Sequence, residues 1–189
     1  MFIKDQDIPV RELQNLIKGC LARERSSQKR IYTVFSPSMM MLCLRYARNR
    51  EEAEEILQDG FLKMFSNIGQ YKNRGSFEGW LRKIMINCAL QRFRNKSPMN
   101  NTISLTDEHV FLDTGADING NLNEKELIRL IQTLTPAYRM VFNLYVFEGM
   151  KHSEIAALLN ISEGTSKSNL SDARKILKRQ LEPKLKLAR

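Results

Sequence analysis

Apolar residues recur at intervals of three and four along most of this chain, which is the spacing of helices that bury one face. The clearest example lies in residues 50–66. No segment shows the two-residue alternation of a half-buried strand, and no internal repeat is evident. The pattern therefore predicts an all-α fold. In the clearest example the inward stripe consists of Ala53, Ile56, Leu57, Gly60, Phe61 and Met64.

The N-terminal part predicts a helix over residues 10–35 that is interrupted by a polar patch. The patch, ARERSSQKR, separates an apolar stripe that begins at Leu13 from one that ends at Phe35, and we expect the helix to break or turn outward there. Pro37 follows, and proline suits the first turn of a helix because it has no N–H to donate. We therefore expect a new helix to start at Pro37.

The outer face of the helix at 50–66 is acidic, although the chain as a whole is basic. Its residues are Glu55, Gln58, Asp59 and Leu62. Such a face repels phosphates, so it is either a solvated helix surface or a docking surface for a basic partner helix. In the second case Leu62 would be the apolar anchor.

A short basic loop, YKNRGSF, precedes a further helix, FEGWLRKIMINCALQRFRNK, which Ser76 is expected to cap. Phe77, Leu81, Ile84 and Cys88 point inward in this interpretation, whereas Leu90 lies on the far side. A basic loop with aromatic rings beside a basic helix suits single-stranded DNA, although most of the Phe77 and Trp80 rings should lie in the core. The predicted DNA-binding residues here are Lys72, Asn73, Arg74, Lys83, Asn87 and Arg94.

Residues 97–123 differ sharply in composition, since Asn, Thr, Asp and Gly dominate and Lys and Arg are absent. We interpret them as a flexible linker, longer than compact domains usually contain. The predicted organisation is two small helical domains, 1–96 and 124–189, joined by this linker.

The second domain begins with two helices, the later of which starts at Thr135-Pro136. A helix-turn-helix follows within Ser153–Leu177. Asn160 can adopt the left-handed conformation that ends a helix, and Ser162 can cap the next helix. The inner side of that second helix is predicted to carry Ser166, Leu170, Ala173 and Leu177.

The outer side of the same helix is predicted to bind DNA. Thr165, Ser168, Asn169 and Asp172 share one face, on which Ser168 and Asn169 could read base edges. The helix start capped by Ser162 is predicted to favour a nearby phosphate, and Thr165 is a further predicted DNA-binding residue. Lys167, Arg174 and Lys178 are predicted to contact phosphates, which position a protein without carrying sequence information. The alternative is an ordinary helical hairpin with a basic surface.

Charge and cysteine content narrow the possible functions. The chain has 30 Lys plus Arg against 21 Asp plus Glu, a net charge of +9, which favours a polyanionic partner. Cys20, Cys43 and Cys88 form no CxxC pair, so buried reduced thiols are expected rather than a zinc site, and no cofactor is predicted. An enzyme would need a metal cluster or an acid–base pair, and neither signature is present. No apolar run reaches the roughly 20 residues of a membrane span, and the N-terminus lacks a signal-peptide core, so we expect a cytoplasmic protein without membrane insertion.

With these motifs in order, the sequence resembles the sigma-70 family, in particular its extracytoplasmic-function (ECF) type. The resemblance covers roughly residues 10–95 and 124–180. It implies that EEAEEILQDGFLKMF docks on the β′ clamp helices of core RNA polymerase and that FEGWLRKIMINCALQRFR opens and reads the −10 element. It also implies that the segment from LTPAYRM to DARKIL reads the −35 element of promoter DNA, that the β flap is a further contact, that an anti-sigma factor regulates the chain, and that the chain has no catalytic activity.

The chain also departs from the family pattern. Ser166 replaces a usual valine, Asn169 and Asp172 stand where basic residues are common, and Ile86 and Gln91 are unusual. We expect these departures to change the promoter sequence and not the class, and Ser166→Val to be neutral or stabilising. The rival function is a stand-alone helix-turn-helix regulator, which would need neither the acidic docking face nor the loop at 71–77.

Overall fold

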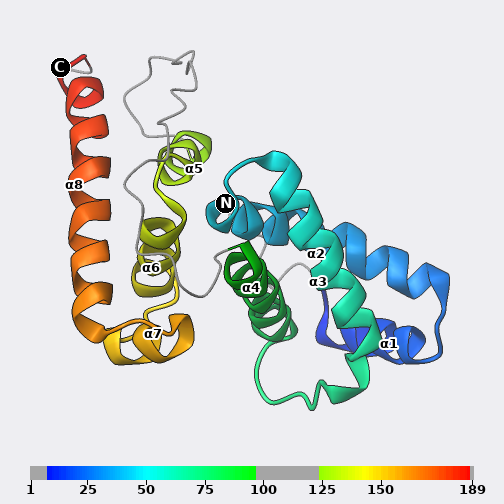
Figure 1. Cartoon of the computed structure of the whole chain (residues 1–189). Coiled ribbons are helices and arrows are strands. Elements are labelled where there is room, and N and C mark those ends of the chain that lie inside the picture. The colour runs from blue at the N-terminus through cyan, green and yellow to red at the C-terminus, as the bar shows by residue number, and fades with distance from the viewer. Residues whose placement is uncertain (1–7, 97–123, 188–189) are drawn as a thin grey trace. The chain divides into compact units, whose positions relative to one another are not determined.

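The computed structural model describes residues 8–96 and 124–187, and every regular element within them is a helix (Figure 1). This confirms the all-α fold. The predicted linker, 97–123, lies outside the described residues. No helix in the described ranges is both long and apolar enough to cross a membrane. The elements are α1 (Val10–Leu21), α2 (Arg25–Tyr46), α3 (Arg50–Ser66), the 3-10 turn η2 (Ile68–Gln70), α4 (Phe77–Lys96), α5 (Glu124–Gln132), α6 (Pro136–Val146), α7 (His152–Leu159) and α8 (Glu163–Leu187).

The chain divides into two compact units, Met1–Gln91 and Arg92–Arg189. In the first unit the polar patch breaks the helix as predicted, because α1 ends at Leu21 and α2 begins at Arg25. Arg23 adopts a left-handed φ of 60° in the connection. The hairpin is tight at Gly19, where a Cβ atom would collide with the hydroxyl of Ser27 on α2. A residue without a side chain therefore lets the two helices approach closely.

The helix start predicted at Pro37 is wrong, because α2 runs without interruption from Arg25 to Tyr46 with Pro37 inside it. Proline normally disrupts a helix interior because it lacks an N–H group and crowds the preceding turn. Here Ile31, Phe35 and Met39, on both sides of the proline, are all buried. Packing of this stripe against the core outweighs the local cost of the proline.

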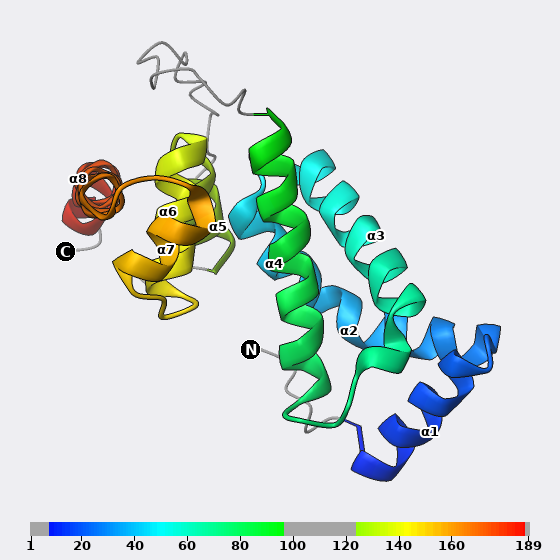
Figure 2. The ribbon, with the colours of Figure 1, turned by 60° about the horizontal axis from the view of Figure 1, so that its bottom comes forward.

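The core of the first unit lies between α2, α3 and α4: α2 packs on α3, and the ring centroids of Phe35 on α2 and Phe77 on α4 lie 5.2 Å apart. Figure 2 shows α3 and α4 running side by side. All six residues of the inward stripe predicted for α3 are buried. Gly60 belongs to this stripe, and a Cβ atom at Gly60 would meet the sulfur of Met85 on α4. Glycine at this position therefore allows α3 and α4 to pack closely.

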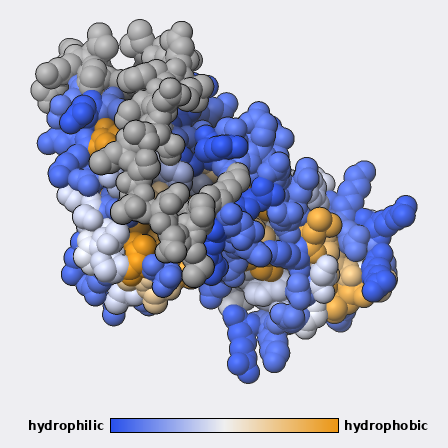
Figure 3. All heavy atoms as spheres, viewed as in Figure 1, coloured by the Kyte–Doolittle hydropathy of each residue, from blue (hydrophilic) through white to orange (hydrophobic). Residues whose placement is uncertain are grey.

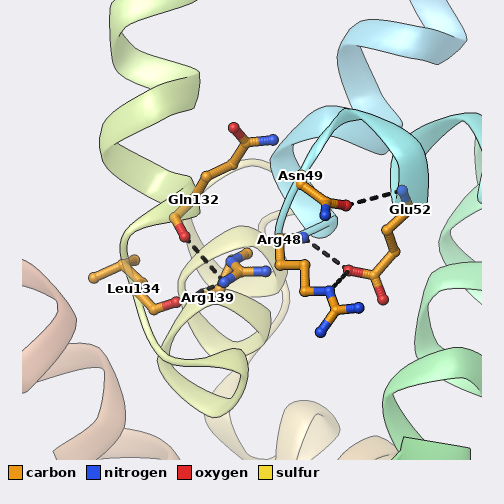
Figure 4. A network of polar contacts seen from close by, with 6 residues as sticks. All are labelled: Arg48, Asn49, Glu52, Gln132, Leu134 and Arg139. Carbon is orange, nitrogen blue, oxygen red and sulfur yellow. Dashed lines mark hydrogen bonds and ion pairs between the residues drawn. The ribbon is translucent and has the colours of Figure 1, made fainter. Parts of the chain in front are cut away.

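The N-terminus of α3 is closed by a local network of polar contacts (Figure 4). The Asn49 side chain accepts a hydrogen bond from the Glu52 N–H at 3.0 Å, and the Glu52 carboxylate accepts one from the Arg48 N–H at 2.9 Å. The first bond satisfies a backbone donor that a helix start leaves without a partner, and the second holds the residue before the cap against the first turn. They fix where α3 begins, and so which of its residues face outward.

In the second unit α8 packs against α6 and α7, and more weakly against α5. The turn between α5 and α6 is held by Arg139, whose Nη2 donates to the carbonyl oxygens of Leu134 at 2.6 Å and Gln132 at 3.1 Å (Figure 4). Arg139 is only 5% exposed. Helix α6 starts at Pro136 as predicted, and Thr135 caps it, since its hydroxyl accepts from the Tyr138 N–H.

Candidate partner and nucleic-acid surfaces

The outer face of α3 combines acidic residues with one prominent apolar side chain. Glu55 and Gln58 are exposed, Asp59 is half-buried, and Leu62 is 67% exposed. Next to this face, the ring centroid of Tyr32 on α2 lies 4.7 Å from the ring centroid of Phe61, the residue that precedes Leu62. In the view of Figure 3, hydrophobic residues form only separate areas among hydrophilic ones. An exposed leucine within an acidic face has the chemistry of a docking surface for a partner with cations around an apolar contact.

The loop at 71–76 presents its three polar side chains to solvent, because Lys72, Asn73 and Arg74 are all exposed. Asn73 and Gly75 have positive φ values of 54° and 99°. The Tyr71 hydroxyl donates to the Gly75 carbonyl at 2.9 Å and so closes the loop. The loop is therefore a defined turn whose polar side chains project from a fixed base.

Aromatic packing forms that base. The ring centroid of Tyr71 lies 5.3 Å from that of Phe77 and 5.4 Å from that of Trp80. Phe77 is buried and Trp80 is half-buried. This agrees with the prediction that most of both rings belongs to the core. The Ser76 hydroxyl accepts from the Gly79 N–H at 3.0 Å, which confirms the predicted cap of α4.

On α4 itself, Lys83, Asn87 and Arg94 are exposed and lie on the side predicted from the sequence. The position predicted for Leu90 is wrong, since this residue is buried. Met85 and Ala89 are buried as well, so α4 buries a wider face than one stripe. This wider buried face includes Leu90 but leaves the polar residues Lys83, Asn87 and Arg94 exposed.

The helix-turn-helix in the second unit consists of α7 and α8, and its turn chemistry is as predicted. Asn160 ends α7 in the left-handed conformation, with φ 55° and ψ 48°. The Ser162 hydroxyl accepts from the Thr165 N–H at 2.9 Å and caps α8. Leu170, Ala173 and Leu177 are buried against the unit's core.

The outward position predicted for Asn169 is wrong, because this residue is only 5% exposed. Ser166 is 0% exposed, and Ser166, Asn169 and Ala173 follow one another at helical spacing on the inner side of α8. Asn169 was predicted on the exposed face because its side chain is polar, but the rotation of α8 about its axis places this residue in the interior. Asn169 is therefore removed from the residues that could read base edges. Thr165 is half-buried, while Ser162, Lys167, Ser168, Arg174 and Lys178 are exposed.

The exposed face of α8 also includes residues that the sequence analysis missed, Ser171 and Lys175. A groove of about 380 Å³ runs along this face. The residues that line it come from the end of α6, the start of α7 and α8, so only the folded chain brings them together. They are Tyr145, His152, Lys167, Leu170, Ser171, Arg174, Lys175 and Lys178.

Ion pairs within α8 accompany these cations. Lys167 Nζ lies 2.7 Å from a carboxylate oxygen of Glu163, and this hydrogen bond and charge lower the pKa of Glu163. Lys175 Nζ lies 3.0 Å from a carboxylate oxygen of Asp172. Lys178 Nζ lies 4.0 Å from a carboxylate oxygen of Glu182. The four cations that line the groove outnumber these three carboxylates, so the face can attract a phosphate backbone.

The thiols of Cys20, Cys43 and Cys88 are buried and free, as the sequence predicted. Burial, together with the nearby Glu24, raises the pKa of Cys20 to about 11. Burial and the neighbouring Cys88 raise the pKa of Cys43 to about 12. Thiols with such pKa values carry little thiolate at neutral pH, so these two act as small apolar residues.

Two profiles of one protein family match the chain in order along its length. Residues 31–98 match sigma-70 region 2, and residues 124–177 match sigma-70, region 4. The chain belongs to the sigma-70 family.

Relatives of known type extend this assignment. The chain is 23% identical to the RNA polymerase sigma-H factor of Pseudomonas aeruginosa over 199 residues, which covers 100% of both chains. It is 29% identical to the ECF RNA polymerase sigma factor SigW of Bacillus subtilis, over 80% of this chain and 87% of that relative. Within the sigma-70 family the chain is of the ECF type. A solved structure of the sigma factor RpoE with the anti-sigma factor NepR from Bartonella quintana matches 82% of this chain and 96% of that chain, at 18% identity and a TM-score of 0.47.

The sigma-70 profiles enclose the surfaces described above. The region 2 match contains α3, the loop at 71–76 and α4, and the region 4 match contains α7 and α8 up to Leu177. Each candidate surface therefore lies inside a segment that the family defines. Lys178 is the one predicted site residue just beyond a match.

Proposed function

We propose that this chain is an alternative sigma factor, which binds core RNA polymerase and directs it to specific promoters for transcription initiation. The observation that carries the proposal is the presence of region 2 and region 4 in order within one chain. The acidic face of α3 with its exposed leucine suits a protein partner. The basic groove on the helix-turn-helix suits a nucleic-acid partner. We propose residues 1–96 and 124–189 as the two functional domains, joined by residues 97–123.

The docking surface in this proposal is the outer face of α3, formed by Glu55, Gln58, Asp59 and Leu62, and its partner is the β′ clamp helices. The exposure of Leu62 and its acidic neighbours support this docking surface. A buried apolar anchor contributes affinity, and the charges around it fix how the two partners align. A second contact, with the β flap, is proposed for the region 4 domain on the basis of the family alone.

Promoter DNA would meet the chain at two surfaces. The exposed side chains of the loop at 71–76 and of α4 would contact the melted −10 element: Lys72, Asn73, Arg74, Lys83, Asn87 and Arg94. At the −35 element, Ser168 would reach base edges and the start of α8 with its cations would bind phosphates. Like other sigma factors, the chain would work in the cytoplasm without catalytic activity of its own, under the control of an anti-sigma factor.

In-vitro transcription with purified core RNA polymerase on a random promoter pool tests the function. We expect specific transcripts only when both the chain and core polymerase are present. If the chain alone bound promoter duplexes tightly and core polymerase added no transcripts, the protein would instead be a stand-alone helix-turn-helix regulator.

The docking surface is tested with a matched pair of leucines. Leu62→Ala should weaken binding to core polymerase by about 1–3 kcal/mol, because an anchor is truncated. Leu21→Ala is the control, since Leu21 is similarly exposed, at 54%, but lies on α1 outside the proposed surface. Equal affinities for the two variants would show that the docking surface lies elsewhere.

A further inference from the structure

One polar contact in the second unit ties the start of α7 to the start of α8. His152, the first residue of α7, has its Nδ1 2.9 Å from the hydroxyl oxygen of Ser166. Ser166 is fully buried, so this bond gives its hydroxyl a partner that water cannot replace.

The same imidazole also contacts α6. Its ring stacks on that of Tyr145, with centroids 4.6 Å apart and planes inclined by 24°. The guanidinium carbon of Arg174, on α8, lies 5.6 Å from the centroid of the same tyrosine ring. His152 is thus one member of a chain of contacts, Arg174–Tyr145–His152–Ser166, that begins and ends on α8.

Two attachment points on one helix define its rotation. Ser166 and Arg174 are eight residues apart in α8, so holding both restricts how the helix can turn about its axis. A hydrogen bond adds direction that apolar packing lacks, because it weakens steeply when its angle departs from linearity. The exposed residues between these points, Lys167 and Ser171 among them, then face one way.

We propose that His152 is a positioning residue for DNA binding: through Ser166 and Tyr145 it fixes the rotation of α8, so that the lining of the basic groove faces the duplex as one surface. The inference rests on the proposed function of this helix in promoter recognition. It assigns a role to a residue at the edge of the groove and explains why a serine occupies a fully buried position on a recognition helix.

It also changes the expectation for Ser166→Val. From sequence alone this substitution appears neutral or stabilising, because valine suits a buried helical position. In the structure it removes the only hydrogen bond recorded for the His152 ring in the described residues. The substitution can therefore preserve the fold while releasing the rotation of α8.

The experiment compares His152→Phe, Ser166→Val and the double variant with the parent. Phenylalanine keeps a ring that can stack on Tyr145 but cannot hydrogen-bond. Each full-length chain is combined with core RNA polymerase, and binding is measured on promoter fragments that the parent selects from a random pool. The same fragments with single-base changes in the upstream element measure sequence discrimination.

Each single variant should bind the selected promoters about three- to tenfold more weakly, the effect of one hydrogen bond. Each should also discriminate less against the base-changed fragments, because a helix held by apolar packing alone is less constrained in rotation and presents Ser168 and Ser171 less uniformly. The double variant should be no weaker than either single variant, since both remove the same bond. Thr135→Ala is the control: it removes the cap of α6, should lower the melting temperature of the same unit, and changes no residue of α7 or α8.

Parent-like affinity and discrimination in both single variants would overturn the inference. So would losses that are fully additive in the double variant, or losses that Thr135→Ala reproduces at equal melting temperature, because these would indicate a general effect on stability. If the parent with core polymerase selected no promoters at all, the proposed function itself would fail, and this outcome is distinct from the others.

Discussion

Replacing Arg139 by methionine should destabilise the second unit strongly. Methionine is a flexible apolar side chain that can occupy much of the same buried space. It cannot donate to the carbonyl oxygens of Gln132 and Leu134, which Arg139 binds at 3.1 and 2.6 Å. Both carbonyls lie where α5 ends, and a helix end leaves such groups without partners of its own.

The magnitude follows from these two bonds. Hydrogen bonds from a charged donor contribute about 1.5–3 kcal/mol each, whereas removing a buried guanidinium relieves part of its desolvation cost. We therefore expect the free energy of unfolding to fall by about 2–4 kcal/mol. For a unit of this size the thermal midpoint should fall by at least about 8 °C.

The assay can separate the two units because the chain has 1 tryptophan, Trp80, which lies in the first unit. Far-UV circular dichroism follows both units, and tryptophan fluorescence follows the first. Arg139→Met should shift the circular-dichroism transition and leave the fluorescence transition in place. Arg129→Met is the control, since Arg129 is an exposed arginine on the neighbouring α5 and should change stability by less than about 0.5 kcal/mol. If the two variants unfolded alike, Arg139 would not be holding this turn.

Four further predictions concern the surfaces and the thiols. Asp59→Lys should weaken core-polymerase binding by about 1–3 kcal/mol through a lost cross-interface charge pair, measured by competition with the parent, and unchanged binding would contradict it. Asn87→Ala should impair open-complex formation on duplex promoters more than binding to pre-melted ones, because pre-melting removes the cost of unpairing; equal defects would indicate only phosphate contact. Lys167→Ala should weaken all upstream sequences alike and flatten the salt dependence by about one unit, whereas Glu163→Gln, which frees the same lysine, should strengthen binding in the same titration. Native Cys20 and Cys43 should react with iodoacetamide at pH 8 at least roughly 100-fold more slowly than in urea, because their pKa values of about 11 and 12 leave little thiolate; rapid native alkylation would contradict this.

Local features of the fold were predictable from the sequence because they depend on nearby residues alone. The inward stripe of α3, the left-handed Asn160 and the caps at Ser76 and Ser162 were all predicted correctly. The two caps and Asn160 involve contacts within about one helical turn, and the stripe of α3 follows from the regular period of a helix, so side-chain type and spacing determine each of them. The division of α1 from α2 at a polar patch belongs to the same class.

The errors arose where packing between helices decides. The helix continues through Pro37 because residues on both sides of it are buried in the core. Leu90 is buried because α4 buries a wider face than a single stripe. Asn169 is buried by a rotation of α8 that the hydrophobic pattern alone does not fix. The groove combines residues from three helices, and the pair of His152 and Ser166 is 14 positions apart. No local pattern in the sequence brings such residues together.

The charge arrangement on α8 bears on whether the chain acts alone or within a complex. Lys167 pairs with Glu163, Lys175 with Asp172, and Lys178 Nζ lies 4.0 Å from a carboxylate oxygen of Glu182. Exposed pairs of this kind contribute little to stability, so a DNA phosphate can displace them at little cost. Until it does, each carboxylate reduces the field that draws the helix toward DNA from a distance. A stand-alone regulator depends on that field to find its site, whereas a polymerase subunit is brought to the promoter by its complex. The paired lysines of α8 therefore favour a helix that reads DNA after delivery by core RNA polymerase.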